Sequence, residues 1–449
     1  MADFRFGNYD FSGPPHIPVY VMLPLGTISE TNEVTDPDGL RTQLQALKGA
    51  GVEGVMVDCW WGRVQGKDSD LYDWDGYKAL FSIVKGAGLK IKAAMSFHKC
   101  GGNVGDTVTI PLPKWVTLIG DQNSDIYYKD HSGSPDDEYL SLGIDNEPAL
   151  DGNTALEVYE SYMQSFKTNM DEEYLKPGII SGIEVGLGPT GELRYPSYQL
   201  SKGWQYPNIG EFQCEDKYMK KSLATMGQAQ GWGTAPQDAG TYNSKPQETL
   251  FFKDGGGYST PYGKFFLSWY SGKLIEHGGN VMQRAKGVFN DVEISAKVPG
   301  IYWWYDTKSH AAEATAGLFT GDGNSVYRSI ARMLANNNAL FNFTCAEMRN
   351  VDKIVDNAYC NPEGLFTEAL NAAYNCPVPT ACENALPTFD SNAYSQILKN
   401  TKLMLGATGQ HVRFFTYLRL GADLMGKLGD FTRFVRCMRG TCKLTKGGC

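Results

Sequence analysis

Five acidic residues stand at or just beyond the ends of apolar segments in this chain: Asp58, Asp106, Glu192, Glu347 and Glu383. Two carboxyl groups are enough to hydrolyse a glycosidic bond, because a protonated one assists the leaving oxygen while an ionised one completes the displacement. A strand-end acid can also simply cap the next helix. The residue types therefore indicate glycoside hydrolysis, but they do not decide which two of the five carboxylates act.

The rest of the composition agrees with an uncharged, polar substrate. Aromatic residues make up 12% of the chain, and Trp60 and Trp61 stand two and three residues after Asp58. Such rings can stack on sugar faces, although large cores also collect them. The net charge of −9 argues against a nucleic-acid partner, which needs a basic surface. No apolar run is long enough to predict a membrane span.

The segment Gly186–Tyr198 begins with a G-x-G-x-x-G pattern, which raises the alternative of dinucleotide binding. That function requires the glycines to open a helix, and Pro189 and Pro196 flank the last glycine instead. The segment therefore favours a catalytic loop that carries Glu192 and Arg194. If Glu192 is the protonated one of the two carboxyl groups, Arg194 is expected to turn away from it, because a guanidinium next to a carboxyl group opposes its protonation.

Other catalytic chemistries have no counterpart in the sequence. There is no phosphate loop, and no nucleophile elbow or Ser-His-Asp order stands out. The six histidines and ten cysteines show no metal-ligand spacing and no C-x-x-C pair. We therefore expect no metal and no cofactor. Six cysteines lie in the last ninety residues, where disulfides are an alternative to the free thiols that we expect.

Glycine-terminated helical patterns show how these residues are positioned. Leu47–Val52 and Val84–Leu89 share the pattern of Lys-Gly-Ala-Gly between apolar residues, and each leads into an apolar run. Glycine is the usual stop after a last helical turn, so both segments indicate a helix followed by a strand. Alternating helices and strands imply a parallel sheet.

Eight strands are expected along the chain. They are His16–Leu25, Gly54–Trp61, Leu89–Phe97, Gly178–Gly186, Glu293–Tyr305, Ala339–Glu347, Val378–Cys382 and His411–Leu420. Helices are expected between them, for example at Asp38–Ala50, Ala155–Met170, Gly263–Phe289, Val326–Ala335 and Ser391–Lys402. Eight such units predict an α/β fold, a single (β/α)8 TIM barrel with its active site at the carboxyl ends of the strands. A doubly wound sheet is the alternative. Long irregular stretches, His98–Asn153 and Leu187–Tyr262, follow strands three and four and are expected to be functional.

Four motifs resemble those of the β-amylases, glycoside hydrolase family 14. They are Met95–Asp106, Gly191–Tyr198, Phe343–Arg349 and Glu383–Pro387, and the resemblance runs from about His16 to Asp423. It implies an enzyme that releases β-maltose, with inversion, from the non-reducing ends of α-1,4-glucans such as starch, glycogen and maltooligosaccharides. The alternatives are a non-catalytic glucan binder on the same fold and a different barrel glycosidase or glucan transferase.

The resemblance also implies roles for individual residues. Glu192 looks like the general acid and Glu383 like the general base, and an inverting pair should lie about 6.5–9.5 Å apart. Residues at the family's sugar-contacting positions are Asp58, His98, Asp106, Lys297, Tyr302, Thr344, Asn384, Ala385, Leu386 and Arg419. Gly101–Val108 resembles the family's mobile lid, and Phe343–Glu347 resembles its smaller inner loop.

The sequence departs from the family pattern at a few positions. Tyr302 replaces a usual histidine, which is expected to change the affinity for sugar rather than abolish activity. Lys99 and Asn350 replace a usual glutamine and aspartate.

We expect a single catalytic domain over residues 1–449, in which about 424–449 form a cysteine-rich tail and no starch-binding module follows. The protein is expected to be a monomer. The first residues lack the apolar core of a secretory signal, which predicts a cytoplasmic protein or a secreted chain that is already processed.

Overall fold

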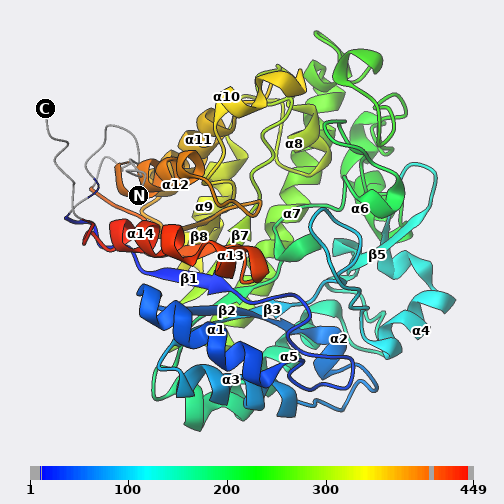
Figure 1. Cartoon of the computed structure of the whole chain (residues 1–449). Coiled ribbons are helices and arrows are strands. Elements are labelled where there is room, and N and C mark those ends of the chain that lie inside the picture. Colours follow the sequence, from blue (N-terminus) through cyan, green and yellow to red (C-terminus); the bar gives the residue numbers. More distant parts are fainter. Residues whose placement is uncertain (1–10, 12, 404–408, 443–449) are drawn as a thin grey trace, which may run out of the picture.

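Eight parallel strands close into a barrel in the order β1-β10-β9-β8-β7-β6-β3-β2 (Figure 1). The computed structural model describes residues 11, 13–403 and 409–442. The barrel strands are β1 (Val19–Met22), β2 (Gly54–Trp60), β3 (Lys90–Ser96), β6 (Ile180–Val185), β7 (Ile294–Val298), β8 (Ala339–Phe343), β9 (Thr380–Glu383) and β10 (Phe415–Tyr417). The predicted (β/α)8 barrel is confirmed, and the doubly wound alternative is wrong because β1 pairs with both β2 and β10.

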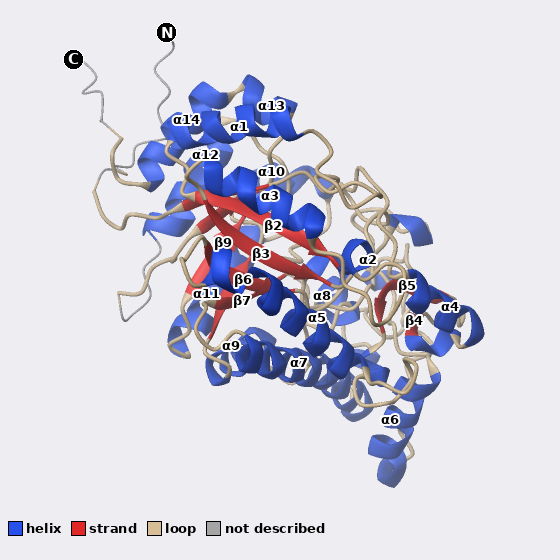
Figure 2. Cartoon of the chain, turned by 90° about the horizontal axis from the view of Figure 1, so that it is seen from below, coloured by secondary structure: helices blue, strands red, loops and turns tan. Residues whose placement is uncertain are grey.

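Helices surround the barrel on its outside (Figure 2). The main ones are α1 (Pro37–Ala50), α3 (Asp75–Gly86), α5 (Ala155–Met170), α7 (Pro261–Val288), α9 (Val326–Asn336), α11 (Pro362–Asn375), α12 (Ser391–Leu398) and α14 (Leu428–Met438). Shorter ones are α2 (Trp61–Val64), α4 (Lys114–Gln122), α6 (Lys217–Gly227), α8 (Ala311–Thr315), α10 (Asn350–Lys353) and α13 (Ala422–Gly426). None of the helices in the described part of the chain has the length and apolarity needed to cross a membrane.

Local signals explain why these helices begin and end where they do. Gly51 ends α1 with φ +90°, a conformation that glycine adopts without steric cost, and its N–H bonds back to Lys48. At the start of α5, the Thr154 hydroxyl accepts from the Glu157 N–H and the Glu157 carboxylate accepts from the Thr154 N–H. The expected bounds of α5 are therefore reproduced to the residue.

Alternation along the strands separates the inside of the barrel from its helical shell. Tyr20, Met22, Met56, Leu340, Ala381 and Phe414 form an apolar cluster of their own, apart from the larger cluster that packs against the helices. Successive strand residues point to opposite faces, so these six fill the barrel interior. Two residues further along a strand the side chain points to the same face. Asp58, Asn342 and Glu383 therefore point into the barrel, as Met56, Leu340 and Ala381 do. Polar groups therefore collect inside the barrel at the carboxyl ends of its strands.

Several expected bounds are wrong. The strand expected at Glu293–Tyr305 ends at Val298, because Pro299 cannot donate to the ladder and the chain turns there. A two-stranded antiparallel sheet, β4 (Tyr127–Lys129) with β5 (Pro135–Leu140), interrupts the first long irregular stretch. It lies with α4 and α6 to one side of the barrel (Figures 1 and 2).

The carboxyl-terminal part of the chain joins the shell of the barrel. Helix α14, which lies within the expected tail, packs against α1 and α12. The nine cysteines among the described residues are all unpaired, as expected, and Cys449 lies outside that part of the chain.

Candidate active site

A largely buried lysine lies between two buried carboxyl groups at the carboxyl ends of the strands. Lys297 Nζ, on β7, is 3.1 Å from Glu383 Oε1 on β9 and 3.6 Å from Glu184 Oε1 on β6. Asn342, on β8, donates to Glu184 and also to Glu383 Oε2 at 3.4 Å. Four strands thus contribute to one network of two carboxyl groups, one amide and one ammonium group.

Burial governs the titration of this network. Burial raises the pKa of Glu383 above its usual range, and the nearby Lys297 ammonium only partly offsets it. Burial acts to lower the pKa of Lys297, but the carboxylates of Glu383 and Glu184 outweigh it and leave that pKa raised. Lys297 is therefore a permanent cation, and its charge favours the ionised form of Glu383 that a base requires, although burial still leaves the pKa of Glu383 raised.

Glu192 reaches the same region from the loop after β6. The Leu193 N–H donates to the Lys297 carbonyl at 2.9 Å, so this loop runs beside β7. Glu192 Oε2 accepts from the Thr190 hydroxyl at 3.0 Å and from Arg194 Nε at 2.7 Å. The side chain remains 16% exposed, which makes its carboxyl group reachable for a ligand.

The expectation that Arg194 turns away from Glu192 is wrong. The Arg194 side chain is almost fully buried, and its guanidinium lies 4.3 Å from the centre of the Tyr198 ring. A buried guanidinium needs compensating partners, and the Glu192 carboxylate supplies one. The prediction from the sequence considered only that the acid must be protonated. It left out that a buried arginine requires a negatively charged partner.

Asp58 and His98 lie on neighbouring strand ends of this region. Asp58 Oδ1 accepts from the Ser96 hydroxyl at 2.7 Å. The His98 ring packs edge-on against Trp60, with centroids 5.0 Å apart. Burial, followed by the charges of Lys297 and Arg194, lowers the pKa of His98 to about 3, so this imidazole is neutral at working pH. A neutral imidazole can both donate a hydrogen bond to a sugar hydroxyl and accept one from it.

The loop after β9 is held in place from two directions. Asn384 is fully buried, and its amide donates to the carbonyls of Leu386 and Leu418 at 2.9 and 2.8 Å. Glu347, from the inner loop, accepts the N–H groups of Ala385 and Leu386 at 2.9–3.1 Å. The Leu386 side chain is left 41% exposed, in a position to contact a ligand.

The other residues expected to contact sugar, Thr344, Arg419 and Tyr302, each have partners of their own. Thr344 uses its hydroxyl oxygen to accept the Gly300 N–H at 2.7 Å. Arg419 donates to the Leu23 carbonyl at 2.8 Å. The Tyr302 ring is nearly buried, with Lys353 Nζ 5.1 Å from its centre and the Tyr206 ring 6.3 Å away. Tyr302 therefore has aromatic and cationic neighbours.

Asp106 turns toward its own loop in this conformation. Its Oδ2 accepts the N–H groups of Gly101, Gly102 and Asn103 at 2.8–2.9 Å. The three amides compensate the carboxylate charge and give the segment Gly101–Val108 a defined shape.

Sequence reasoning missed Glu184 and Asn342. Both sit inside apolar strands, and that contrast is a usable signal: a single Glu in Ile180–Val185 and a single Asn in Ala339–Phe343 must each find a partner within the barrel.

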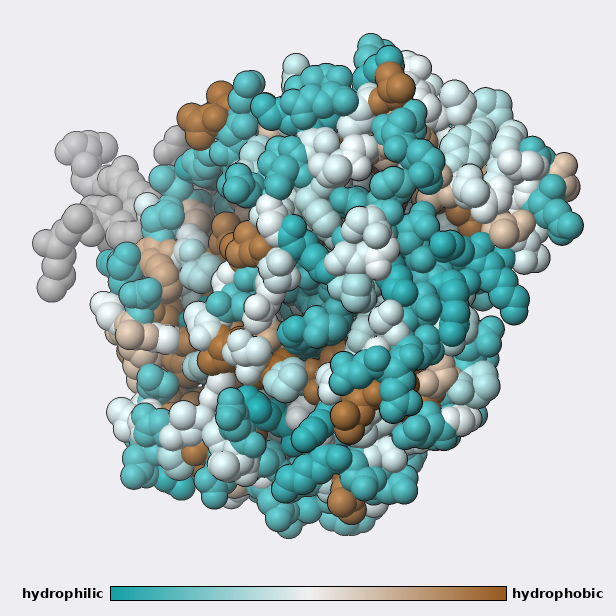
Figure 3. Space-filling model, turned by 90° about the vertical axis from the view of Figure 1, so that its right-hand side faces the viewer, coloured by the Kyte–Doolittle hydropathy of each residue, from teal (hydrophilic) through white to brown (hydrophobic). Residues whose placement is uncertain are grey.

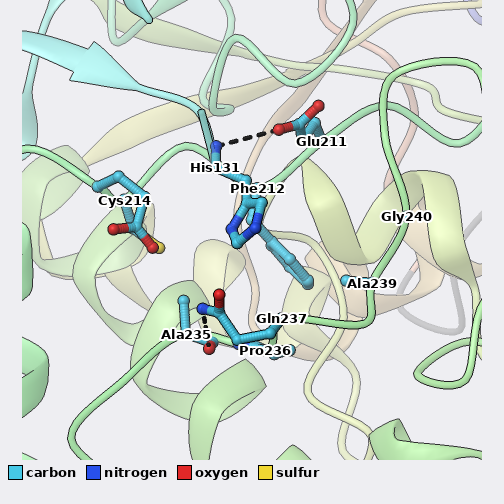
Figure 4. Close-up of a pocket in the computed structure, with 10 residues that line it drawn as sticks. His131, Glu211, Phe212, Cys214, Ala235, Pro236, Gln237, Ala239 and Gly240 are labelled. Carbon is cyan, nitrogen blue, oxygen red and sulfur yellow. Dashed lines mark hydrogen bonds between the residues drawn. The ribbon is translucent and has the colours of Figure 1, made fainter. Parts of the chain in front are cut away.

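The small cavity in Figure 4 lies elsewhere. It encloses about 10 Å³, room for a single water molecule, and its lining includes Glu211, which accepts the His131 N–H at 3.0 Å. None of the catalytic or sugar-contacting residues expected from the sequence lines this cavity. We therefore assign it no part in the chemistry.

Comparison with known proteins gives consistent results. A model of the family described as glycosyl hydrolase family 14 matches residues 20–443. The chain is 49% identical over 443 residues to "Beta-amylase 2, chloroplastic" of Arabidopsis thaliana, which covers 97% of this chain and 82% of the relative. It is 48% identical over 432 residues to a β-amylase of Glycine max, which covers 94% and 86%.

A solved structure matches in the same way. The catalytic domain of the β-amylase from Paenibacillus polymyxa aligns with a TM-score of 0.76 and 31% identity, over 93% of this chain and 97% of that one.

Proposed function

Because the chain belongs to glycosyl hydrolase family 14, we propose that it hydrolyses α-1,4-glucosidic bonds from the non-reducing ends of starch-type glucans and releases β-maltose. The observation that best supports this proposal is the buried, lysine-held carboxylate of Glu383 in the same site as the accessible carboxyl group of Glu192. A pair of carboxyl groups in different environments is what acid–base hydrolysis requires.

We propose that Glu192 donates a proton to the glycosidic oxygen while Glu383 removes one from the attacking water. Both hydrogen bonds to the Glu192 carboxylate go to Oε2, which leaves Oε1 as the oxygen to carry the proton. The ammonium of Lys297, 3.1 Å from Glu383, favours the ionised form of that base and opposes the effect of burial on its pKa. The separation of about 6.5–9.5 Å between the two carboxyl groups remains a prediction for the substrate complex.

We further propose that Asp58, His98, Lys297, Tyr302 and Thr344 bind the sugar hydroxyls and ring faces. Asn384, Ala385, Leu386 and Arg419 would act from the loops after β9 and β10, where Glu347 and the buried Asn384 amide fix the first of these loops. No metal or cofactor takes part in this scheme.

Product analysis on soluble starch tests the proposal. We expect maltose as the sole early product, because an exo-acting pocket cuts a fixed distance from the chain end. A ladder of oligosaccharides would instead identify an endo-acting or transferring enzyme. Binding of glucan without any product would identify a non-catalytic relative.

We predict that Asp106→Asn lowers kcat on soluble starch by about 10- to 100-fold, because a closing lid excludes water and strengthens the polar contacts inside. The asparagine keeps an acceptor for the lid amides but loses the charge. The melting temperature should not change. Asp137→Asn is the matched control, since Asp137 forms a partly exposed ion pair with Lys99 beside the lid. Equal activity in both variants would remove Asp106 from the mechanism.

We also propose that the enzyme acts as a monomer, because one chain supplies every residue of the proposed site. The face shown in Figure 3 is mostly hydrophilic, with hydrophobic side chains in small separate groups. Light scattering in solution tests this point. A cytoplasmic location, or secretion of a chain that is already processed, is likewise a proposal. The name of the Arabidopsis thaliana relative is a reason to include plastids when cell fractions are assayed.

A further inference from the structure

A single carboxyl oxygen of Glu138 receives two hydrogen bonds from two different loops. Glu138 lies on β5, and its Oε1 accepts Asn103 Nδ2 at 2.6 Å and the Thr190 backbone N–H at 3.0 Å. Asn103 belongs to the lid segment Gly101–Val108, and Thr190 belongs to the loop that carries Glu192. Glu138 therefore joins the lid to the loop of the proposed acid.

The path continues to the Glu192 carboxylate itself. The Thr190 hydroxyl lies 3.0 Å from Glu192 Oε2 and 2.6 Å from the Pro189 carbonyl, so these two acceptors compete for its single proton, and Arg194 Nη2 donates to the same hydroxyl oxygen at 3.4 Å. The orientation of Thr190 thus decides whether Glu192 keeps this hydrogen bond.

Thr190 holds an unfavourable backbone conformation. Its φ of +54° is rare for a residue branched at Cβ, so the surroundings must enforce it. The hydrogen bond from its N–H to Glu138 is one of the contacts that do so. If this acceptor were lost or displaced, Thr190 would be free to relax.

Glu138 is placed to serve as a fixed anchor. It is 3% exposed and lies in the paired sheet of β4 and β5. Its carbonyl accepts the Lys99 N–H at 2.7 Å, so the chain is tied to β5 immediately before the lid begins. Its second carboxyl oxygen is buried without a hydrogen-bond partner among the described residues. Burial raises the pKa of Glu138, which fits a neutral carboxyl group that uses Oε1 as a carbonyl-type acceptor.

We propose that Glu138 is a positioning residue that couples the conformation of the lid to the orientation of the general acid, through Asn103 on one side and Thr190 on the other. This inference rests on the proposed function, because it assigns Glu192 the role of acid. When the lid holds Asn103 against Glu138, the shared oxygen and the Thr190 N–H are fixed, and the Thr190 hydroxyl directs Glu192. When Asn103 withdraws, that constraint weakens.

The test compares two substitutions of Glu138 that differ in one property. Glu138→Gln keeps a carbonyl acceptor in the same place, whereas Glu138→Leu has a similar volume and no acceptor. Asn103→Ala removes the lid's side of the link without disturbing the barrel core, so it remains informative even if Glu138→Leu folds poorly.

We expect Glu138→Leu to lower kcat on soluble starch by about tenfold or more with a smaller change in KM, since the lost contact acts on the acid. The alkaline limb of the pH–kcat profile should also move. Glu138→Gln should keep kcat within about threefold of the wild type, and its alkaline limb should stay at the wild-type position. Asn103→Ala should lower kcat in the wild-type background but not further in Glu138→Leu, because two changes on one path are not additive.

Amide hydrogen exchange supplies a readout that does not depend on activity. Both Asn103→Ala and Glu138→Leu should speed exchange in the peptide that contains Thr190 and Glu192, while Glu138→Gln should not. Unchanged exchange there, together with additive effects on kcat, would overturn the coupling even in an active enzyme. A wild-type protein that makes no maltose but shows the expected exchange would instead refute the proposed function and leave the structural coupling in place.

Discussion

Glu383→Gln is expected to lower kcat on soluble starch by at least about 10³-fold while maltose binding changes little, because the amide cannot take a proton from water. The substitution keeps the shape of the side chain and an oxygen for Lys297, which lies 3.1 Å away in the wild type. Glu192→Gln should cause a loss of similar size, because it removes the proton that assists the leaving glucan.

The two variants should differ on a substrate that needs no acid. With α-maltosyl fluoride, whose leaving group departs without protonation, Glu192→Gln should recover much of its turnover and Glu383→Gln should not. Glu276→Gln is the matched control, because Glu276 is an exposed residue of α7 that pairs with Lys273. Recovery by Glu383→Gln would reverse the two assignments, and full activity of either variant on starch would remove that residue from the mechanism.

Lys297→Met is expected to cause the second large effect, a loss of about 10²-fold or more in kcat/KM at pH 5. The variant leaves Glu383 and Glu184 buried without their shared cation. Burial already raises the pKa of Glu383, and removal of the ammonium raises it further. A base is active only when it is ionised, so activity falls as the pH drops through this pKa. The acidic limb of the pH profile should therefore move to higher pH.

A second buried lysine provides the control for this experiment. Lys92 lies inside the barrel, 3.1 Å from Glu293, with its ammonium 3.8 Å from the centre of the Phe414 ring. Both Lys92→Met and Lys297→Met should lower the melting temperature, but Lys92→Met should leave the acidic limb where it is. If both variants kept the wild-type limb, Lys297 would not control the titration of Glu383.

The order of the barrel elements could be predicted from the sequence because it rests on local signals. Glycine stops after α1 and α3 and the capping box of α5 are determined by a few neighbouring residues. Strand ends were less certain. The apolar run after Val298 predicted a longer strand. This prediction failed because Tyr302, Trp303 and Trp304 are buried by packing within a loop and do not belong to a strand.

The hairpin of β4 and β5 shows where local reasoning fails. β5 buries Asp136 and Glu138 while exposing Asp137, so the usual alternation of apolar and polar residues is absent. The buried acids find partners that are distant in the sequence: Glu138 contacts Asn103 and Thr190. A single sequence does not encode such pairings in any local pattern.

The candidate site was predictable in its residue types and not in its contacts. Glu192 and Glu383 could be named only through the resemblance to a family, because five carboxylates were equivalent by their position at segment ends. The Lys297 contacts with Glu383 and Glu184 depend on the register of β6, β7 and β9. The orientation of Arg194 was predicted wrongly, because its need for a partner when buried appears only in the folded chain.

The anomeric form of fresh product tests the central claim most directly. Proton NMR of maltose released from soluble starch, recorded before mutarotation is complete, distinguishes the two anomers at the new reducing end. A general acid at Glu192 and a water-activating base at Glu383 require attack from the opposite face, so the initial product should be β-maltose. Initial release of α-maltose would mean retention of configuration, and it would contradict the assignment of Glu383 as a base that activates water.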